Sequence, residues 1–216
     1  MPLEKMNEFF NARAQTYDNH MLVDLGLDEF YGEIAMHINP EKPNFKLLDL
    51  GCGTGIELER LFVKYPLMSV VGIDISPGML EQLQAKYSNK KINTVCGSYF
   101  DIPFGEEYDV VLSTYSLHHW NETDKLGLYK KIYDSITAGG MFIEGDYTCK
   151  TTQQEQFFQA ELIKLRKTQN LHDNEFYHFD IPLTAQTQKR ILYNAGFSCV
   201  EIVREWENTS IIVAGK

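Results

Sequence analysis

The chain of 216 residues carries 20 Lys plus Arg against 30 Asp plus Glu, a formal net charge of −10. Its length suits one domain. The composition, with 44% hydrophobic and 23% charged residues, excludes a disordered, collagen-like or coiled-coil chain. No apolar run approaches the roughly 20 residues of a membrane span, and the polar N-terminus lacks a signal-peptide core. We therefore expect a cytoplasmic protein with no membrane partner.

The cysteine spacing and the net charge argue against two further classes of function, metal or redox chemistry at cysteines and nucleic-acid binding. Cys52, Cys96, Cys149 and Cys199 show no close spacing of a zinc or redox motif, so we expect four reduced thiols. An acidic chain also lacks the clustered Lys and Arg that bind phosphate backbones, which argues against nucleic acid as the partner.

The predicted elements begin with residues 1–40, which look like two helices placed before a sheet. From residue 46 onward, short apolar runs alternate with longer amphipathic stretches, as buried parallel strands alternate with helices. The apolar runs are 46–50, 69–73, 92–95, 109–113, 141–144, 199–203 and 210–214.

Capping residues mark three of the intervening helices. Ser76 precedes a proline at the first helical position, and Asn121 can cap the next helix. Thr184 can cap a third helix, which ends at Gly196 in a left-handed conformation. The last two apolar runs are joined by only residues 204–209, too few for a helical crossover, so the final strand is expected to be antiparallel to its neighbour.

Residues 150–183 do not fit this alternation. They form an insertion rich in aromatic and amide residues between the fifth strand and the last helix, a place where an excursion usually covers a site. We therefore expect one domain over residues 1–216, with 1–40 as an N-terminal helical cap and 150–183 as a lid over the active site.

The strongest functional signal is Leu47-Leu-Asp-Leu-Gly-Cys-Gly-Thr-Gly55, an apolar strand that runs into three glycines, with a helix opening at about Ile56. Such glycines allow a tight turn and a close approach of backbone to ligand at the positive end of a helix. The dinucleotide fingerprint would need a glycine at position 56, and no Gly-Lys-Ser/Thr follows. Asp74 ends the second strand, where open α/β sheets reach the two hydroxyls of an adenosine ribose. An adenosine-type ligand is therefore predicted.

Taken together, these segments resemble the class I S-adenosylmethionine-dependent methyltransferases of the small, Rossmann-like kind. The matching segments, which run from about residue 46 to the end, are 49–55, 71–79, 96–104, 108–119, 138–144 and 195–197. The resemblance implies an α/β, Rossmann-like, seven-stranded, mostly parallel sheet with an antiparallel last strand and helices on both faces. It also implies S-adenosyl-L-methionine as the cofactor.

The resemblance assigns roles to individual residues. The implied cofactor-binding residues are Asp49 toward the ammonium group, Gly51, Cys52, Gly53 and Gly55 around the methionine end, Asp74 on both ribose hydroxyls, Ile75 and Met79 on the adenine faces, Ser98 and Tyr99 near the adenine amino group, and Ser113 near the transferring methyl. The family often has an acid where Ser98 stands, so Ser98 or the backbone near Tyr99 is expected to replace it. Cys52 is expected to be a small loop residue and not a nucleophile.

The chemistry requires few catalytic groups, because a sulfonium cofactor arrives activated and the protein mainly binds, aligns and excludes water. A general base is needed only if the acceptor must lose a proton. The candidate catalytic residues are His119, Asp146 and Tyr17, the last resembling an aromatic that closes over the cofactor. Further acceptor-side candidates are His20, Tyr115, His118, Tyr147, Tyr177 and His178. His118 and His119 look like a metal pair, but adjacent side chains need further ligands nearby, so no metal is expected.

The leading hypothesis is methyl transfer to a small or medium organic acceptor. Residues 184–216 are also similar to the C-terminal end of enzymes that modify tRNA wobble uridine, which leaves RNA modification with a cofactor derived from S-adenosylmethionine as a second hypothesis. The basic cluster of Lys150, Lys164, Arg166 and Lys167 is then either a solvated helix face or a surface for an anionic substrate. Two less favoured hypotheses are an NAD(P)-dependent oxidoreductase and a non-catalytic cofactor-binding protein. Monomer and homodimer both stay open.

Overall fold

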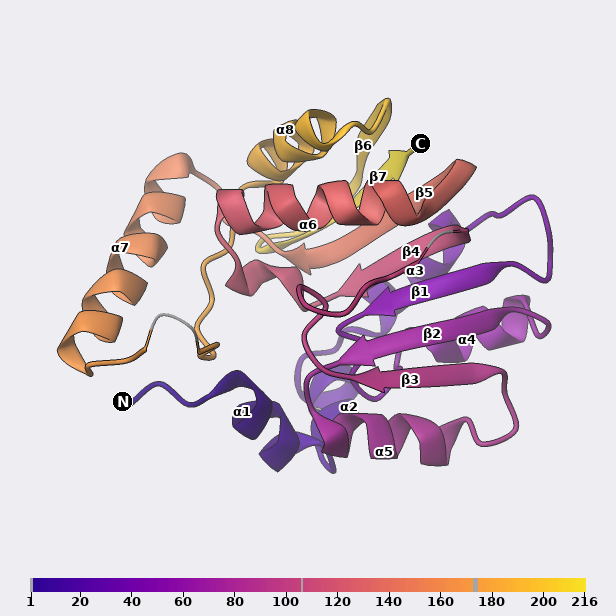
Figure 1. Ribbon diagram of the computed structural model, residues 1–216, viewed down its shortest axis with the longest axis horizontal. Helices are drawn as coiled ribbons and strands as arrows, with labels where there is room; N and C mark the ends of the chain where they lie inside the picture. The colour runs from indigo at the N-terminus through magenta and orange to yellow at the C-terminus, as the bar shows by residue number, and fades with distance from the viewer. Residues whose placement is uncertain (1, 106, 173–174) are drawn as a thin grey trace.

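A seven-stranded sheet forms the centre of the computed structural model, which describes residues 2–105, 107–172 and 175–216 (Figure 1). The strands are β1 (Lys46–Leu50), β2 (Ser69–Asp74), β3 (Ile92–Cys96), β4 (Tyr108–Thr114), β5 (Ile136–Tyr147), β6 (Cys199–Glu205) and β7 (Thr209–Gly215). The helical segments are α1 (Met6–Arg13), α2 (Tyr17–Asn19), η1 (His20–Asp24), α3 (Asp28–His37), α4 (Leu58–Lys64), α5 (Pro77–Lys86), η2 (Leu117–His119), α6 (Glu122–Ser135), α7 (Thr152–Thr168) and α8 (Ala185–Ala195).

The strand order is β3-β2-β1-β4-β5-β7-β6, which confirms the predicted fold. Neighbouring strands from β3 to β5 are parallel, and β7 is antiparallel to both β5 and β6. The chain moves outward from β1 to β3 and then returns to β4 on the other side of β1. This reversal places the carboxyl ends of β1 and β4 beside a crevice, where open α/β sheets bind ligands.

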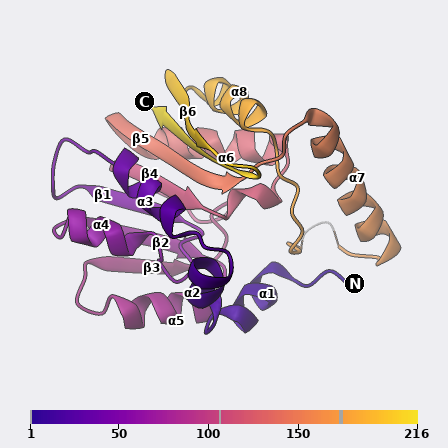
Figure 2. The same ribbon diagram turned by 180° about the vertical axis from the view of Figure 1, so that it is seen from behind.

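Helices cover both faces of the sheet, and the alternation of side chains along each strand builds two cores. Leu47 packs in a buried cluster with side chains of α3, α4 and α5, whereas Leu48 and Leu50 pack in a second cluster with those of α6 and α8. In Figure 1, α6 lies in front of the sheet and α4 behind it, and Figure 2 shows the reverse side. Burial on both faces explains why the strands appear as continuous apolar runs.

The predicted helix caps are confirmed. The Ser76 hydroxyl accepts a hydrogen bond from a backbone N–H of α5, and the Asn121 side chain accepts two from α6. Thr184 caps α8, which ends at Gly196 with a φ of 116°. These signals are local, because a cap depends on its own side chain and on the next three backbone N–H groups.

Three predicted boundaries differ from the structure. Residues 1–40 form four helical segments and not two. A turn at residues 14–16 separates α1 from α2, and Gly26, with a φ of 67°, turns the chain between η1 and α3. The helix after the glycine loop begins at Leu58, two residues later than predicted. Strand β5 is longer than 141–144, because it follows α6 directly and is irregular through Gly139 before Met141 pairs with β4.

The insertion at 150–183 consists of α7 and an extended return segment, and its residues 173 and 174 lie outside the described part of the chain. The return segment pairs with the N-terminus: Met6 N donates to Phe176 O at 2.9 Å, and His178 N donates to Glu4 O at 2.9 Å. Both views place α7 at one end of the molecule, beside the sheet and not upon it (Figures 1 and 2). None of the described helices is long and apolar enough to cross a membrane.

An ion pair lies inside the core between α6, β5 and α8. Lys125 Nζ is 2.8 Å from Glu144 Oε1 and 2.7 Å from Gln188 Oε1, and the Tyr129 hydroxyl donates to the other Glu144 oxygen. The Lys125 and Glu144 side chains are 0% exposed. The position of Lys125 on an amphipathic helix did not reveal this burial, because most lysines lie at the surface.

Candidate active site

The glycine loop leaves the end of β1 in left-handed backbone conformations that favour glycine. Gly51, Gly53 and Gly55 have φ angles of 70°, 49° and 72°. A Cβ added to Gly51 would lie 2.0 Å from the Ser116 hydroxyl oxygen, so this turn also presses against the loop after β4. The loop therefore requires glycine at position 51 for both its conformation and its packing.

Replacing Gly51 by alanine is expected to destabilise the fold and to weaken cofactor binding. The left-handed backbone costs alanine about 1–2 kcal/mol, and the clash with Ser116 adds to this. Urea unfolding and titration with S-adenosylhomocysteine measure both effects. Gly32→Ala is the matched control, because a Cβ there meets no atom within 4 Å and the position is helical. Equal stability of the two variants would contradict the steric argument.

Asp74 ends β2 with both carboxylate oxygens directed by backbone donors. Gly53 N donates to Oδ2 at 2.9 Å and Ser76 N donates to Oδ1 at 2.8 Å. Burial raises the pKa of Asp74 to about 6, although these backbone hydrogen bonds oppose the shift. Each oxygen keeps a further lone pair, so the carboxylate can also accept the two hydroxyls of a ribose.

The affinity for an adenosine cofactor is expected to fall as the pH drops through about 6. Protonation of Asp74 removes its charge-assisted hydrogen bonds, so affinity decreases by up to about tenfold per pH unit below that value. The free energy of unfolding should change in the opposite direction. The pKa of Asp74 in the folded protein lies above its ordinary value of 3.8, so the folded state binds more protons than the unfolded state. The contribution of Asp74 to stability therefore increases as the pH falls from about 6 to 4. Calorimetric titration and urea unfolding at several pH values measure the two. In Asp74→Asn both trends should become smaller, and the part that persists belongs to other buried carboxyl groups such as Asp49, whose pKa is also raised by burial. Trends of unchanged size would show that Asp74 does not cause them.

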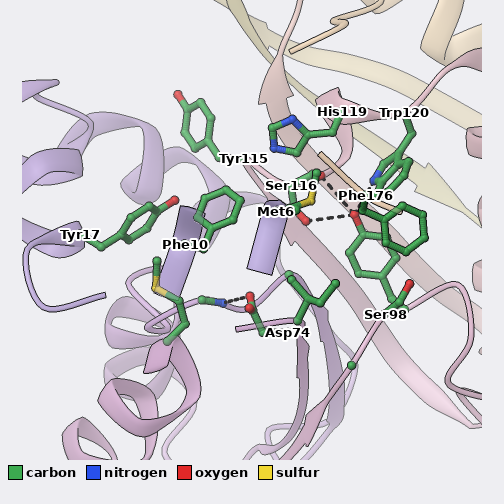
Figure 3. Close-up of a pocket in the computed structure, with 16 residues that line it drawn as sticks. Met6, Phe10, Tyr17, Asp74, Ser98, Tyr115, Ser116, His119, Trp120 and Phe176 are labelled. Atoms are coloured by element: carbon green, nitrogen blue, oxygen red, sulfur yellow. Dashed lines mark hydrogen bonds between the residues drawn. The ribbon is translucent and has the colours of Figure 1, made fainter. Parts of the chain in front are cut away.

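A cavity of about 560 Å³ lies between the glycine loop and the N-terminal segment, and we call it the first cavity (Figure 3). It brings together nine predicted site residues, namely Tyr17, Gly51, Gly53, Asp74, Ile75, Met79, Ser98, Tyr99 and His119. Its other lining residues are Met6, Phe10, Gly97, Tyr115, Ser116, Trp120 and Phe176.

Five predicted site residues are not among those that line the first cavity: Asp49, Cys52, Gly55, Ser113 and Asp146. Ser113 is fully buried and donates to Leu50 O at 2.8 Å, so its hydroxyl joins β4 to β1. Cys52 is buried against β2, consistent with a small loop residue. The Gly55 carbonyl accepts a hydrogen bond from the Tyr87 hydroxyl at 2.8 Å.

Asp49 and Glu57 carry buried carboxylate oxygens that lack partners. Both Asp49 oxygens and Glu57 Oε1 lack an N–H or hydroxyl donor among the described residues, and the two carboxyl groups adjoin each other. Burial, and then the neighbouring charge of Glu57, hold the pKa of Asp49 well above its usual range. Unpaired buried carboxylates are costly, so this region lacks a donor or a positive charge. The ammonium group of the predicted cofactor fits that need.

Tyr99 and Ser98, which were predicted to lie near the adenine amino group, both line the first cavity. The Tyr99 hydroxyl donates to Ser116 O at 3.2 Å and accepts from Trp120 Nε1 at 2.6 Å, and the Ser98 hydroxyl accepts from Phe100 N at 3.2 Å. Ser98 therefore already bonds within its own turn. No spacing signal indicated Trp120, because its contribution depends on how the loop after β4 folds back on Tyr99.

A second cavity of about 1090 Å³ adjoins the first and shares Phe10, Tyr17 and Tyr115 with it. Its remaining lining residues are Phe9, Arg13, Thr16, Asn19, His20, Met21, Asp24, Leu25, His118, Tyr147, His178 and Asp180. Of the predicted acceptor-side candidates, all except His119, Asp146 and Tyr177 line this cavity. Its walls come from the N-terminal segment, the carboxyl ends of β4 and β5, and the return segment of the insertion.

A cluster of histidines and carboxylates stands where the two cavities adjoin. His118 Nδ1 is 2.5 Å from Asp146 Oδ1, and His118 Nε2 is 3.3 Å from Asp180 Oδ1. Burial alone would lower the pKa of His118, but the two carboxylates outweigh it and raise the pKa to about 9. Burial lowers the pKa of His119. Asp146 is 2% exposed and lies behind His118, and it lines neither cavity.

The chain matches the family model described as a methyltransferase domain over residues 47–140. A carboxy-S-adenosyl-L-methionine synthase of Campylobacter fetus is 26% identical over 100% of this chain and 97% of that protein. A malonyl-[acyl-carrier protein] O-methyltransferase of Priestia megaterium is 26% identical over 67% of this chain. The match spans 52% of that relative, so the chain covers about half of its length.

Among solved structures, the human N-acetylserotonin methyltransferase in complex with S-adenosylmethionine superposes with a TM-score of 0.65 and 18% identity. The likeness covers 96% of this chain and 55% of the human one. At that level of identity the likeness concerns the fold alone.

Proposed function

Because this chain carries a class I S-adenosylmethionine-dependent methyltransferase domain, we propose that it transfers the cofactor's methyl group to a small organic acceptor held in the second cavity. One observation carries this proposal: the two cavities adjoin and share three aromatic side chains, Phe10, Tyr17 and Tyr115. A methyl group on a cofactor in the first cavity could thus reach an acceptor in the second without crossing bulk water.

The residues around the first cavity would bind and orient the cofactor, whose sulfonium supplies an activated methyl group. Asp74 would accept the ribose hydroxyls, and the unpaired carboxylates of Asp49 and Glu57 would balance the ammonium charge. Ile75 and Met79 would pack against the adenine. Tyr17 borders both cavities and would align the acceptor; burial raises its pKa, so its hydroxyl stays neutral.

The lining of the second cavity favours a compact acceptor with an aromatic or polar group over a nucleic acid. Aromatic rings and histidines line most of it, with Arg13 as its one Lys or Arg side chain among the described residues. The Arg13 guanidinium also stacks on Phe9 and bonds to Phe9 O and Glu4. A polynucleotide would require several free cations.

The proposal is tested by incubating the protein with methyl-labelled S-adenosylmethionine and pooled small acceptors, with transfer RNA as a separate arm. We expect label on a small molecule together with formation of S-adenosylhomocysteine. Label on RNA alone would overturn the acceptor class. Tight binding of S-adenosylhomocysteine without transfer to any acceptor would support a non-catalytic cofactor-binding protein. Tight binding of NADH in its place would support an oxidoreductase.

A second candidate function is synthesis of carboxy-S-adenosylmethionine, supported by the Campylobacter fetus relative that aligns with the chain from end to end. The same incubation separates the two functions by mass. A methyltransferase converts the cofactor to S-adenosylhomocysteine. A carboxy-S-adenosylmethionine synthase would instead replace one hydrogen of the cofactor's methyl group by a carboxyl group, so the pool must also include a carboxylate compound that can supply carbon dioxide. Arg13 would be the group to pair with a carboxylate in the second cavity, and that carboxylate would compete with the Glu4 side chain for its guanidinium.

A further inference from the structure

One ring nitrogen of His119 is buried at the edge of the first cavity without a partner. The His119 side chain is 2% exposed, and its Nε2 has no hydrogen-bond partner within the described part of the chain. In Figure 3 the ring points from the loop after β4 toward Phe10, and the two ring centroids are 6.2 Å apart. Phe10 lines both cavities, so His119 lies close to their junction. Buried polar atoms are nearly always hydrogen-bonded, so the missing partner requires an explanation.

The return segment of the insertion determines which nitrogen of His119 carries the hydrogen. Nδ1 lies 3.2 Å from Phe179 O and 3.3 Å from Asp180 Oδ1, and a carbonyl and a carboxylate oxygen can only accept. The hydrogen of the neutral ring is therefore on Nδ1, which leaves a lone pair on Nε2. Because Nδ1 faces the return segment, Nε2 faces away from it. The partner that Nε2 lacks is thus a hydrogen-bond donor.

Two carboxylates keep His118 charged, and this charge keeps His119 neutral. Burial would lower the pKa of His118, but Asp146 at 2.5 Å and Asp180 at 3.3 Å raise it to about 9. Burial, and then the charge of His118, lower the pKa of His119. His178, whose ring centroid lies 5.1 Å from that of His119, is also neutral because burial lowers its pKa to about 4. At neutral pH the adjacent pair therefore consists of one imidazolium and one unprotonated imidazole.

The donors of the cofactor are assigned to other groups of the first cavity. Its ribose hydroxyls, its ammonium group and its adenine amino group have the acceptors named above, so the donor for His119 Nε2 comes from the acceptor molecule. We propose that His119 Nε2 accepts the proton of the atom that attacks the methyl group. The acceptor is then a compound whose attacking atom carries a hydrogen, as in a hydroxyl, thiol or amino group, and not a carboxylate. This role depends on the proposed methyl transfer.

The step balances in atoms and charge. The attacking atom forms a bond to the methyl carbon, whose bond to the cofactor's sulfur breaks with the electron pair left on sulfur. The bond between the attacking atom and its hydrogen breaks, and the proton goes to His119 Nε2. Asp180 Oδ1, 3.3 Å from Nδ1, compensates the charge of the imidazolium that forms. His118 and Asp180 act through His119 and are positioning residues.

The test uses the full chain, methyl-labelled S-adenosylmethionine and two pools of small acceptors, one of hydroxyl, thiol and amino compounds and one of carboxylates. We expect label in the first pool. His119→Gln should lower kcat for the labelled compound by about 10²–10⁴-fold, while S-adenosylhomocysteine binds nearly as it does to the parent. His37→Gln is the matched control, because His37 also has an acidic neighbour, Glu33 at 3.7 Å, but lies on α3 outside both cavities.

Three readouts distinguish proton transfer from a structural role. At saturating cofactor, kcat of the parent should fall by up to about tenfold per pH unit below the pKa of His119, which lies under its ordinary 6.5. This fall should be much weaker in His119→Gln. In His118→Gln it should move to higher pH, because the charge that opposes protonation of His119 is removed. Added imidazole should restore part of the activity of His119→Ala, since it can accept the proton in the vacated space.

Four results would overturn the role of His119: label on a carboxylate, parental activity of His119→Gln, an equal loss in His37→Gln, or loss of S-adenosylhomocysteine binding in His119→Gln, which would place Nε2 against the cofactor. A fall in kcat at the same pH in His118→Gln would reject the part of His118. Circular dichroism verifies that each variant folds. If the parent labels neither pool, the proposed function fails and the proton transfer with it. If the parent transfers label and His119→Gln does so equally well, the proton transfer alone fails.

Discussion

Replacing Asp74 by asparagine is expected to weaken cofactor binding by about tenfold or more at neutral pH. A hydrogen bond to a charged group contributes about 1.5–3 kcal/mol, and 1.4 kcal/mol corresponds to a factor of ten in affinity. The substitution keeps the size of the side chain, but it places an amide NH₂ opposite one of two backbone donors, Gly53 N or Ser76 N. The carboxamide must therefore lose a loop contact as well as the charged contacts to the ribose.

Calorimetric titration with S-adenosylhomocysteine measures this loss. Asp134→Asn is the matched control, because Asp134 is an exposed aspartate on α6 that lines neither cavity. The control should bind as the parent does. If Asp74→Asn bound with parental affinity, the carboxylate at the end of β2 would not contact the cofactor. An equal loss in both variants would assign the effect to net charge and not to the ribose contact.

Replacing Lys125 by methionine is expected to lower the free energy of unfolding by about 3–5 kcal/mol. Removing one partner of a buried ion pair leaves the other charge uncompensated, and this costs far more than the pair itself contributes. Glu144 would lose its partner at 2.8 Å while remaining fully buried on β5. Gln188 Oε1 would lose its donor at 2.7 Å. Neither cavity is lined by these residues, so the folded fraction should bind cofactor normally.

Urea unfolding measures the effect, and two further variants identify its cause. Lys130→Met lies on the same helix with an exposed side chain and should stay within about 0.5 kcal/mol of the parent. Lys125→Met combined with Glu144→Gln removes both charges, so we expect it to be more stable than Lys125→Met alone. A double variant less stable than the single one would show that lost packing, and not the stranded carboxylate, causes the destabilisation.

Much of the lining of the first cavity could be predicted from the sequence, because the signals for its glycine loop and strand end involve residues that are close together in the chain. The glycines at 51, 53 and 55 predict the turn that they themselves form, and Asp74 follows directly on the apolar run that predicts its strand. Likewise, Ser76, Asn121 and Thr184 cap helices through bonds that reach only a few residues along the chain. The strands are buried on both faces, so they appear in the sequence as continuous apolar runs.

For the second cavity the sequence indicated only a set of candidate residues. Tyr17 and His119 line the first cavity. Asp146 instead lies behind His118, and the Ser113 hydroxyl joins β4 to β1 through a hydrogen bond to Leu50 O. Nothing in the spacing distinguishes these cases. Asp180 was not among the candidates, since it stands in an extended segment without a motif.

The sequence by itself therefore determined the order of strands and helices, the glycine loop and the acid that faces it, because periodicity, capping and turn conformation are properties of neighbouring residues. Only the tertiary structure decided how the N-terminus and residues 175–183 meet over the first cavity, that Lys125 is buried with Glu144, and that Asp180 lies beside two histidines. Each of these depends on contacts between segments far apart in the chain, whose energies are set by packing and burial, and such contacts leave no regular spacing in the sequence.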